Sequence, residues 1–142
     1  MSMRAPTPSR ADFVCWTTEK LRNADTDQFH HVNNAVMASF FEGGRMAVFS
    51  GQDMQTLKGN ANLAVVRLVM NFHKELFYPG DVSIGTRLTS VGERSLVLEQ
   101  GLFKDESCIA SAQAVCVLID HVSGRAVTLS DALRKCLLGS SV

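Results

Sequence analysis

The sequence predicts an α+β fold in which one antiparallel sheet of five to six strands wraps around one long central helix. An early segment, from about Asn34 to Ser50, is apolar on nearly all sides, as expected for a helix inside a protein. After it come four or five segments in which apolar and polar residues alternate, the period of a half-buried strand. Helix and strands that are segregated along the chain in this way indicate a helix packed on a sheet.

Length and composition indicate a single domain. We expect residues 13–142 to form it and residues 1–12, which include Pro6 and Pro8, to be a disordered leader. The 14 basic and 14 acidic residues balance, which excludes a strongly basic surface for nucleic acid. No apolar run approaches the roughly 18 residues of a membrane span. We therefore expect a cytoplasmic protein that binds neither nucleic acid nor membrane.

The cysteines do not indicate a metal site. They are Cys15, Cys108, Cys116 and Cys136, and they form no C-x-x-C pair and no metal-ligand spacing. Three of them have apolar neighbours, as is typical of free thiols in a reducing compartment, although an even count leaves disulfide bridges open. The sequence predicts neither a bound metal nor a separate cofactor.

The first strand and the helix are marked by composition. Residues 13–22 are rich in β-branched and aromatic side chains and predict a strand, and residues 23–33 form a polar loop before the helix. Gly43 and Gly44 inside the helix cost roughly 1 kcal/mol each, which is tolerable where another backbone comes close. Gly51 ends the helix, and residues 52–62 are expected to form a polar, mobile connection.

The rest of the chain is predicted to be mainly strands. Apolar and polar residues alternate over 66–73, 82–91 and 95–103, with turn residues between these segments. The segment at 108–120 is apolar on both faces, with Ala110, Ala112 and Ala114 on one, which indicates a central strand covered on both sides. A short last strand is expected at 126–129, after which Ser130 caps a terminal helix over 131–138.

The polar loop and the start of the helix carry one specific motif. It reads D-x-x-x-H-V-N-N and consists of Asp27, His31, Val32, Asn33 and Asn34. A Phe-rich helix that includes Glu42–Arg45 follows. This pattern resembles the active-site segment of the hot-dog-fold thioesterases, the 4-hydroxybenzoyl-CoA and fatty acyl thioesterase group, and is closest to the members with H-V-N-N. The resemblance implies a hot-dog fold and hydrolysis of an acyl thioester.

The resemblance also implies roles for the motif residues. Asp27 matches the catalytic carboxylate, which acts either as nucleophile or as general base on water. His31 matches the motif histidine and could orient water or the thioester, or could be a loop residue that hydrogen-bonds backbone. Backbone N–H groups near Asn34, at the helix start, would stabilise the oxyanion. Asn33 or Asn34 is the expected N-cap, and Asp25, the competing acid, is expected to shape the loop.

The expected substrate is an acyl-CoA or an acyl-carrier-protein thioester, with coenzyme A as part of the substrate. The candidate substrate-binding residues are Asn33, Met37, Phe40, Phe41 and Phe72. The apolar ones could instead be plain core, although a pocket for an acyl group needs such side chains. Four cations could contact the phosphates of the substrate or could instead protect exposed strand edges: Lys74, Arg87, Arg94 and Lys104. Phe29 stands where some plant-type carrier-protein thioesterases have Asn, which argues against their amide-assisted mechanism.

Two other functions are conceivable for a chain of this fold. A dehydratase or hydratase would need a different acid and histidine arrangement and a proline-rich active-site segment, which the sequence lacks. A domain that binds an acyl-CoA or a partner protein without turnover stays open. The resemblance further implies a homodimer, or a dimer of dimers, in which protomers pair edge to edge and place each active site at their interface.

Overall fold

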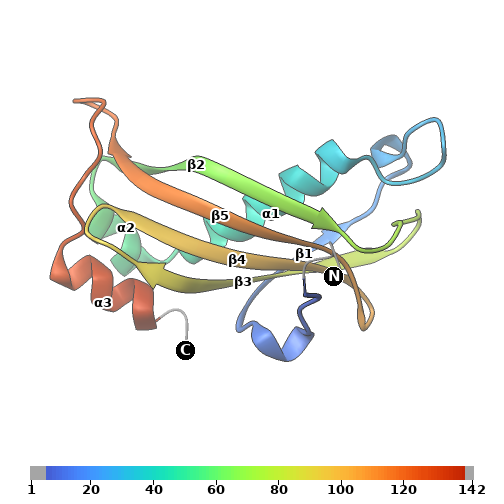
Figure 1. Ribbon diagram of the computed structural model, residues 1–142. Coiled ribbons are helices and arrows are strands. Elements are labelled where there is room, and N and C mark those ends of the chain that lie inside the picture. The colour runs from blue at the N-terminus through green and yellow to red at the C-terminus, as the bar shows by residue number, and fades with distance from the viewer. Residues whose placement is uncertain (1–5, 140–142) are drawn as a thin grey trace, which may run out of the picture.

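The computed structural model describes residues 6–139 and has one antiparallel sheet in that part of the chain. The strands are β1 (Cys15–Lys20), β2 (Ala61–Phe72), β3 (Asp81–Val91), β4 (Ser95–Lys104) and β5 (Ser107–Asp120). The helices are α1 (Asn34–Val48), α2 (Gln52–Lys58) and α3 (Asp131–Gly139). The five strands lie in the order β1-β3-β4-β5-β2, and α1 lies along one face of the sheet against β1, β3 and β4 (Figure 1). This is the hot-dog arrangement, so the predicted fold class is confirmed.

Helix α1 begins where the sequence predicts it because Asn33 caps it. The Asn33 side-chain oxygen accepts a hydrogen bond from the N–H of Ala35 at 2.8 Å, so Asn33 rather than Asn34 is the cap. The buried residues that face the sheet recur at spacings of three and four residues, the period of a helix face. They include Met37, Phe40, Phe41 and Gly44.

The core between α1 and the sheet has two parts. The part near the start of α1 contains Phe41, Ile84 and Leu102, which are fully buried. The other part lies toward the end of α1 and includes Leu133 and Leu137 of α3. Burial of one such side chain contributes about 1.5–3 kcal/mol. The first part therefore holds the start of α1, and the motif loop before it, against the sheet.

The outer face of the sheet, opposite α1, is partly covered by the chain that precedes β1. Phe13 packs directly over Gly85, where a Cβ would lie 2.6 Å from the Phe13 ring. The Phe13 ring also meets the rings of Trp16 and Phe103 edge-on at 6.0 Å between centroids. Arg10–Asp12 form a short 3-10 helix within the predicted leader, of which residues 1–5 lie outside the described part. The division into a leader and one domain stays a prediction.

The structure corrects the prediction for residues 52–62. This segment is not a mobile connection, because it contains α2 and the first residues of β2. Met54 of α2 is buried in the same core cluster as Leu133 and Leu137 of α3. A polar segment of this length can be helical when an apolar side chain anchors it, so tertiary packing overrides its composition.

Two strand predictions are also wrong. The segment at 126–129 forms no strand, and within it only Ala126 pairs, in an isolated bridge with Ile119. The reason is that β4 already pairs with β5 as far as Val117, which leaves only the last residues of β5 free on that side. β5 is an interior strand, paired with β4 on one side and with β2 on the other, but it is not covered on both faces, because Gln113 on its outer face is exposed. The predicted small residues Ala110, Ala112 and Ala114 are buried.

Candidate functional site

The motif loop is a closed turn ahead of α1. Thr26 and Val32 pair in an antiparallel bridge, and the N–H of Asp27 donates a hydrogen bond to the carbonyl oxygen of His31 at 2.8 Å. Between them His30 has a φ of 68°, which is uncommon for a residue other than glycine. The loop therefore folds back on itself and brings Asp27 beside His31.

The Asp27 carboxylate is half-buried in this loop. Its Oδ1 accepts hydrogen bonds from the N–H of Phe29 at 2.9 Å and, less closely, from the N–H of His31 at 3.4 Å. Among the described residues no donor is bonded to Oδ2. One carboxylate oxygen thus holds the loop in shape, and the other is available to water or substrate.

Asp25 has a different environment from Asp27. Its side chain is only 1% exposed and accepts hydrogen bonds from the Arg22 guanidinium and from the Arg22 N–H, each at 2.8 Å. Burial alone raises the pKa of the Asp25 carboxyl, but these hydrogen bonds and the charge of Arg22 outweigh it and hold the pKa below its ordinary value. The Asp25 carbonyl also accepts the N–H of Asn33 at 2.9 Å. Asp25 therefore shapes the loop, as the sequence predicts.

The start of α1 exposes an unpaired backbone donor. The N–H of Ala35 is taken by the Asn33 side chain, and those of Val36 and Met37 by the Asn33 carbonyl. In the described part of the chain, the N–H of Asn34 has no acceptor. Because helix dipoles place partial positive charge at this end, the Asn34 N–H is suited to bind a developing negative charge.

A hollow of about 230 Å³ opens at this point and is called here the helix-start hollow. Four of the predicted site residues line it, namely His31, Asn34, Met37 and Phe72. The other wall runs from Phe72, the last residue of β2, to Leu76. The His31 ring stands edge-on to Phe77 with 5.1 Å between centroids, and its Nε2 lies 3.4 Å from Glu75 Oε2.

The remaining predicted site residues lie outside the helix-start hollow. Asp27 is joined to it through its two hydrogen bonds with His31, and Asn33 caps the helix. Phe40 and Phe41 are buried between α1 and the sheet, in the same core cluster as Met37. The sequence did not predict His73 and Glu75 as lining residues, although a polar run directly after an apolar strand was the available signal.

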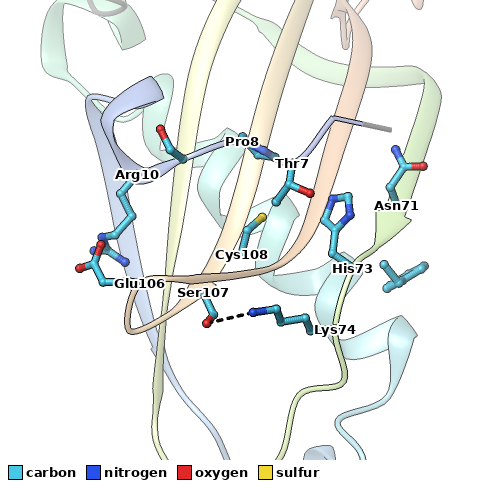
Figure 2. Close-up of a pocket in the computed structure, with 11 residues that line it drawn as sticks. Thr7, Pro8, Arg10, Asn71, His73, Lys74, Glu106, Ser107 and Cys108 are labelled. Carbon is cyan, nitrogen blue, oxygen red and sulfur yellow. Dashed lines mark hydrogen bonds between the residues drawn. The ribbon is translucent and has the colours of Figure 1, made fainter. Parts of the chain in front are cut away.

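A second and larger space, called here the outer cavity, lies on the far side of the segment that follows β2. Its volume is about 700 Å³. Figure 2 shows the residues that line it. Its walls are the chain from Thr7 to Arg10, the residues from Asn71 to Lys74 at the end of β2 and directly after it, and the residues from Glu106 to Cys108. Burial raises the pKa of the Cys108 thiol to about 11, so this thiol is protonated at neutral pH.

Neither a metal-ligand set nor a membrane span is found in residues 6–139. No group of three His, Cys, Asp or Glu side chains among them is placed to hold a metal ion. None of their helices combines the length and apolar character that crossing a membrane requires.

Comparison with known proteins identifies the family. Residues 21–137 match the sequence profile of the Thioesterase-like superfamily. The chain belongs to this superfamily. YsmA of Bacillus subtilis (strain 168), an uncharacterised protein, is 24% identical over 131 residues, which cover 91% of this chain and 88% of YsmA. The membership shows that the protein is a thioester hydrolase.

Two solved structures show how far the likeness to other members of the fold extends. The PA5185 protein of Pseudomonas aeruginosa strain PAO1 has a TM-score of 0.85 at 23% identity, covering 96% of this chain and 97% of its own. A thioesterase of Thermus thermophilus, solved with coenzyme A and zinc, has a TM-score of 0.80 at 25% identity. The match covers 92% of this chain and 96% of that thioesterase. The thioesterase fold thus accounts for nearly the whole chain.

Proposed function

We propose that this thioester hydrolase acts on an acyl-CoA, or on an acyl-carrier-protein thioester, and releases the free acid and the thiol. Asp27 acts as nucleophile or general base, and N–H groups at the start of α1 near Asn34 stabilise the oxyanion. The observation that carries the proposal is the N–H of Asn34, which lacks an acceptor among the described residues and belongs to a residue that lines the helix-start hollow.

A thioester carbonyl in the helix-start hollow can direct its oxygen to this N–H. The negative charge that develops on the oxygen during attack is stabilised by the N–H and by the positive end of the α1 dipole. His31 lines the same hollow, and the Glu75 carboxylate near its Nε2 orients the ring. His31 is therefore suited to contact the attacking water or the thioester.

Two routes lead from this arrangement to products. As general base, Asp27 takes a proton from water while the water oxygen attacks the carbonyl carbon. The C–S bond then breaks, and the sulfur takes this proton from Asp27 and leaves as the thiol. As nucleophile, the Asp27 carboxylate attacks the carbon itself, the thiolate leaves, and water hydrolyses the resulting anhydride. Both routes need the acid beside the hollow, and the hydrogen bond from the Asp27 N–H to the His31 carbonyl supports that placement.

The acyl group would contact the apolar side of the helix-start hollow. Met37 and Phe72 line it directly, and Phe40 and Phe41 belong to the same core cluster as Met37. Asn33 contributes by capping the helix whose first N–H binds the substrate. Coenzyme A enters as part of the substrate, and the bound coenzyme A in the Thermus thermophilus thioesterase supports this choice.

We extend the proposal to assembly as a homodimer or a dimer of dimers. β2 is an edge strand, and four large apolar side chains are exposed on it, those of Val65, Val66, Leu68 and Phe72. A long apolar edge is a liability that a second copy removes by pairing edge to edge. Because Phe72 also lines the helix-start hollow, a partner on this edge would complete the hollow.

The experiment that tests the catalytic assignment is replacement of Asp27. With an acyl-CoA that the wild type hydrolyses, Asp27→Asn is expected to lower kcat by about 10²-fold or more, the scale of a lost general base. Thiol release from a panel of aliphatic and aromatic acyl-CoAs measures the rate and identifies the preferred acyl group.

The matched control is Asp25→Asn, which changes the neighbouring loop carboxylate in the same way. Because Asp25 is bonded to Arg22 and away from the hollow, this variant is expected to lose stability rather than turnover. A larger loss of kcat for Asp25→Asn than for Asp27→Asn would show that the carboxylate is wrongly assigned. Tight binding of acyl-CoA without any thiol release by the wild type would indicate the non-catalytic binding function instead.

A further inference from the structure

The outer cavity and the helix-start hollow share a wall. The consecutive residues Phe72, His73 and Lys74 line both spaces. In Figure 2 the His73 and Lys74 side chains stand at the outer cavity, across from Thr7 of the segment that precedes β1. Only the end of β2 therefore separates the two spaces, and a long ligand bound in the helix-start hollow could extend past it into the outer cavity.

The two spaces differ in size in a way that matters for a long substrate. The helix-start hollow holds about 230 Å³, and the outer cavity about 700 Å³. Sites for small molecules and cofactors typically measure about 300–1,000 Å³. The hollow alone is thus sufficient for the reacting thioester end, while the outer cavity has the size of a site for the remainder of a thiol such as coenzyme A.

The outer cavity also carries cations that are not neutralised. Lys74 Nζ donates to the neutral Ser107 hydroxyl at 3.3 Å, and Arg10 donates to the Asp105 carbonyl at 2.9 Å while lying over the Trp16 ring. Among residues 6–139 neither Lys74 nor Arg10 has a carboxylate within salt-bridge distance. Glu106 is the single acid among the residues that line the cavity. By contrast, Arg87 on the same face is paired with Glu99 at 2.7 Å.

We infer that the outer cavity binds the phosphate-bearing part of the thiol, a phosphorylated pantetheine, with Lys74 and Arg10 as the phosphate contacts. The inference rests on the proposed function, since it assigns a place to the rest of the same substrate. The Ser107 hydroxyl now bonded to Lys74 is a weak, neutral partner, and a phosphate oxygen forms a stronger, charge-assisted hydrogen bond with an ammonium group. Arg10 lies before residues 21–137, the region that the family profile covers.

Calorimetric binding of coenzyme A, 4′-phosphopantetheine and pantetheine to the unmodified protein and to the double variant Arg10→Gln/Lys74→Gln tests the inference. The double variant is expected to raise the Kd for coenzyme A by about tenfold or more, the scale of one lost charge-assisted contact. Its Kd for pantetheine, which has no phosphate, should stay within about twofold of the wild type. Its Kd for 4′-phosphopantetheine should rise by a similar factor, since this compound carries the phosphate next to the pantetheine arm. A loss confined to coenzyme A would overturn the inference.

The matched control is Arg94→Gln. Arg94 is an exposed cation directly before β4, whereas the outer cavity lies near the other end of that strand, roughly 30 Å away at the rise of a strand. This variant should bind coenzyme A like the wild type. An equal loss for pantetheine and coenzyme A in the double variant would show a structural effect and overturn the inference, as would wild-type affinity for coenzyme A or a comparable loss in Arg94→Gln.

The outcomes also separate this inference from the proposed function. If the wild type releases thiol from acyl-CoA and the double variant keeps full affinity for coenzyme A, the cavity assignment fails and the hydrolysis proposal stands. If coenzyme A binds through Lys74 and Arg10 while no acyl-CoA in the panel is hydrolysed, the cavity assignment stands and the hydrolysis proposal fails. Absence of any coenzyme A binding by the wild type overturns the cavity assignment.

Discussion

Two neighbouring glycines of α1 offer a sharp test of how closely the helix must approach the sheet. Gly43 and Gly44 are adjacent in sequence, but only Gly44 is buried against the sheet. Replacing each of them by alanine adds the same single carbon atom to the same helix. Any difference in stability between the two variants therefore reports what lies opposite each position.

The structure sets the expected magnitudes. A Cβ at Gly44 would lie 2.8 Å from Gln100 Nε2 and 2.8 Å from Ile84 Cγ2, closer than real Cβ contacts. Gln100 cannot easily move, because its Nε2 donates to the Phe41 carbonyl at 2.8 Å. Overpacking of this kind costs about 1–3 kcal/mol, whereas alanine in a helix interior gains roughly 0.5–1 kcal/mol over glycine. We expect Gly44→Ala to lose about 1–2 kcal/mol of unfolding free energy.

Gly43→Ala should have the opposite sign. The nearest atom to its Cβ would be Glu19 Oε1 at 3.7 Å, an ordinary van der Waals contact, so only the gain in helix propensity of about 0.5–1 kcal/mol remains. Denaturant unfolding followed by circular dichroism, at one fixed protein concentration, measures both variants. A stabilised Gly44→Ala, or shifts of equal sign and size in both variants, would refute the close approach of α1 to β3 and β4.

Three further outcomes are expected. Asn33→Ala removes the cap of α1 and should lower the unfolding free energy by about 1 kcal/mol; an unchanged denaturant midpoint would contradict the cap. Arg22 holds the pKa of Asp25 in the folded protein below its ordinary value. The ionised carboxylate therefore stabilises the fold fully above the ordinary carboxyl pKa of about 4. This stabilisation is lost as the pH falls through the lower pKa of the folded state. The denaturant midpoint of Asp25→Asn should therefore lie below that of the wild type at pH 7, and the two midpoints should converge near pH 2. Light scattering at micromolar concentration should give a multiple of 15.5 kDa, and a fully active monomer would contradict the dimer.

The sheet and the long helix were predictable because their patterns are local. Helix α1 was expected over about 34–50 and is observed at Asn34–Val48, and the strand expected over 82–91 is observed at Asp81–Val91. Half-buried strands and helices each have a characteristic spacing of apolar residues that can be recognised within one segment. By contrast, α2 is held by the burial of Met54 beside α3, and a contact between distant segments leaves no local pattern.

Of the candidate site, only the wall formed by the motif loop and the start of α1 was predictable from the sequence. The motif identified the residues of the loop and of the first turn of α1, since all of them lie within one short segment. His73 and Lys74 face that turn only because β2 pairs with β5 in one register, which ends β2 at Phe72 beside Ala110. Phe40 and Phe41 were candidates for the pocket, but their positions on the buried stripe of α1 turn them toward the core.

The position of the candidate oxyanion donor depends on a contact far along the same helix. Gly44 lies ten residues after Asn34, or about 15 Å at the rise of an α-helix. There α1 comes so close to β3 and β4 that no side chain fits, and the Gln100 side chain joins the Phe41 carbonyl to the Thr86 hydroxyl across the gap. Because the helix is rigid, fixing it at Gly44 also fixes the position of the N–H at its N-terminus. Gly44→Ala should therefore disturb kcat for acyl-CoA as well as stability, whereas Gly43→Ala, which leaves the contact intact, should change stability alone.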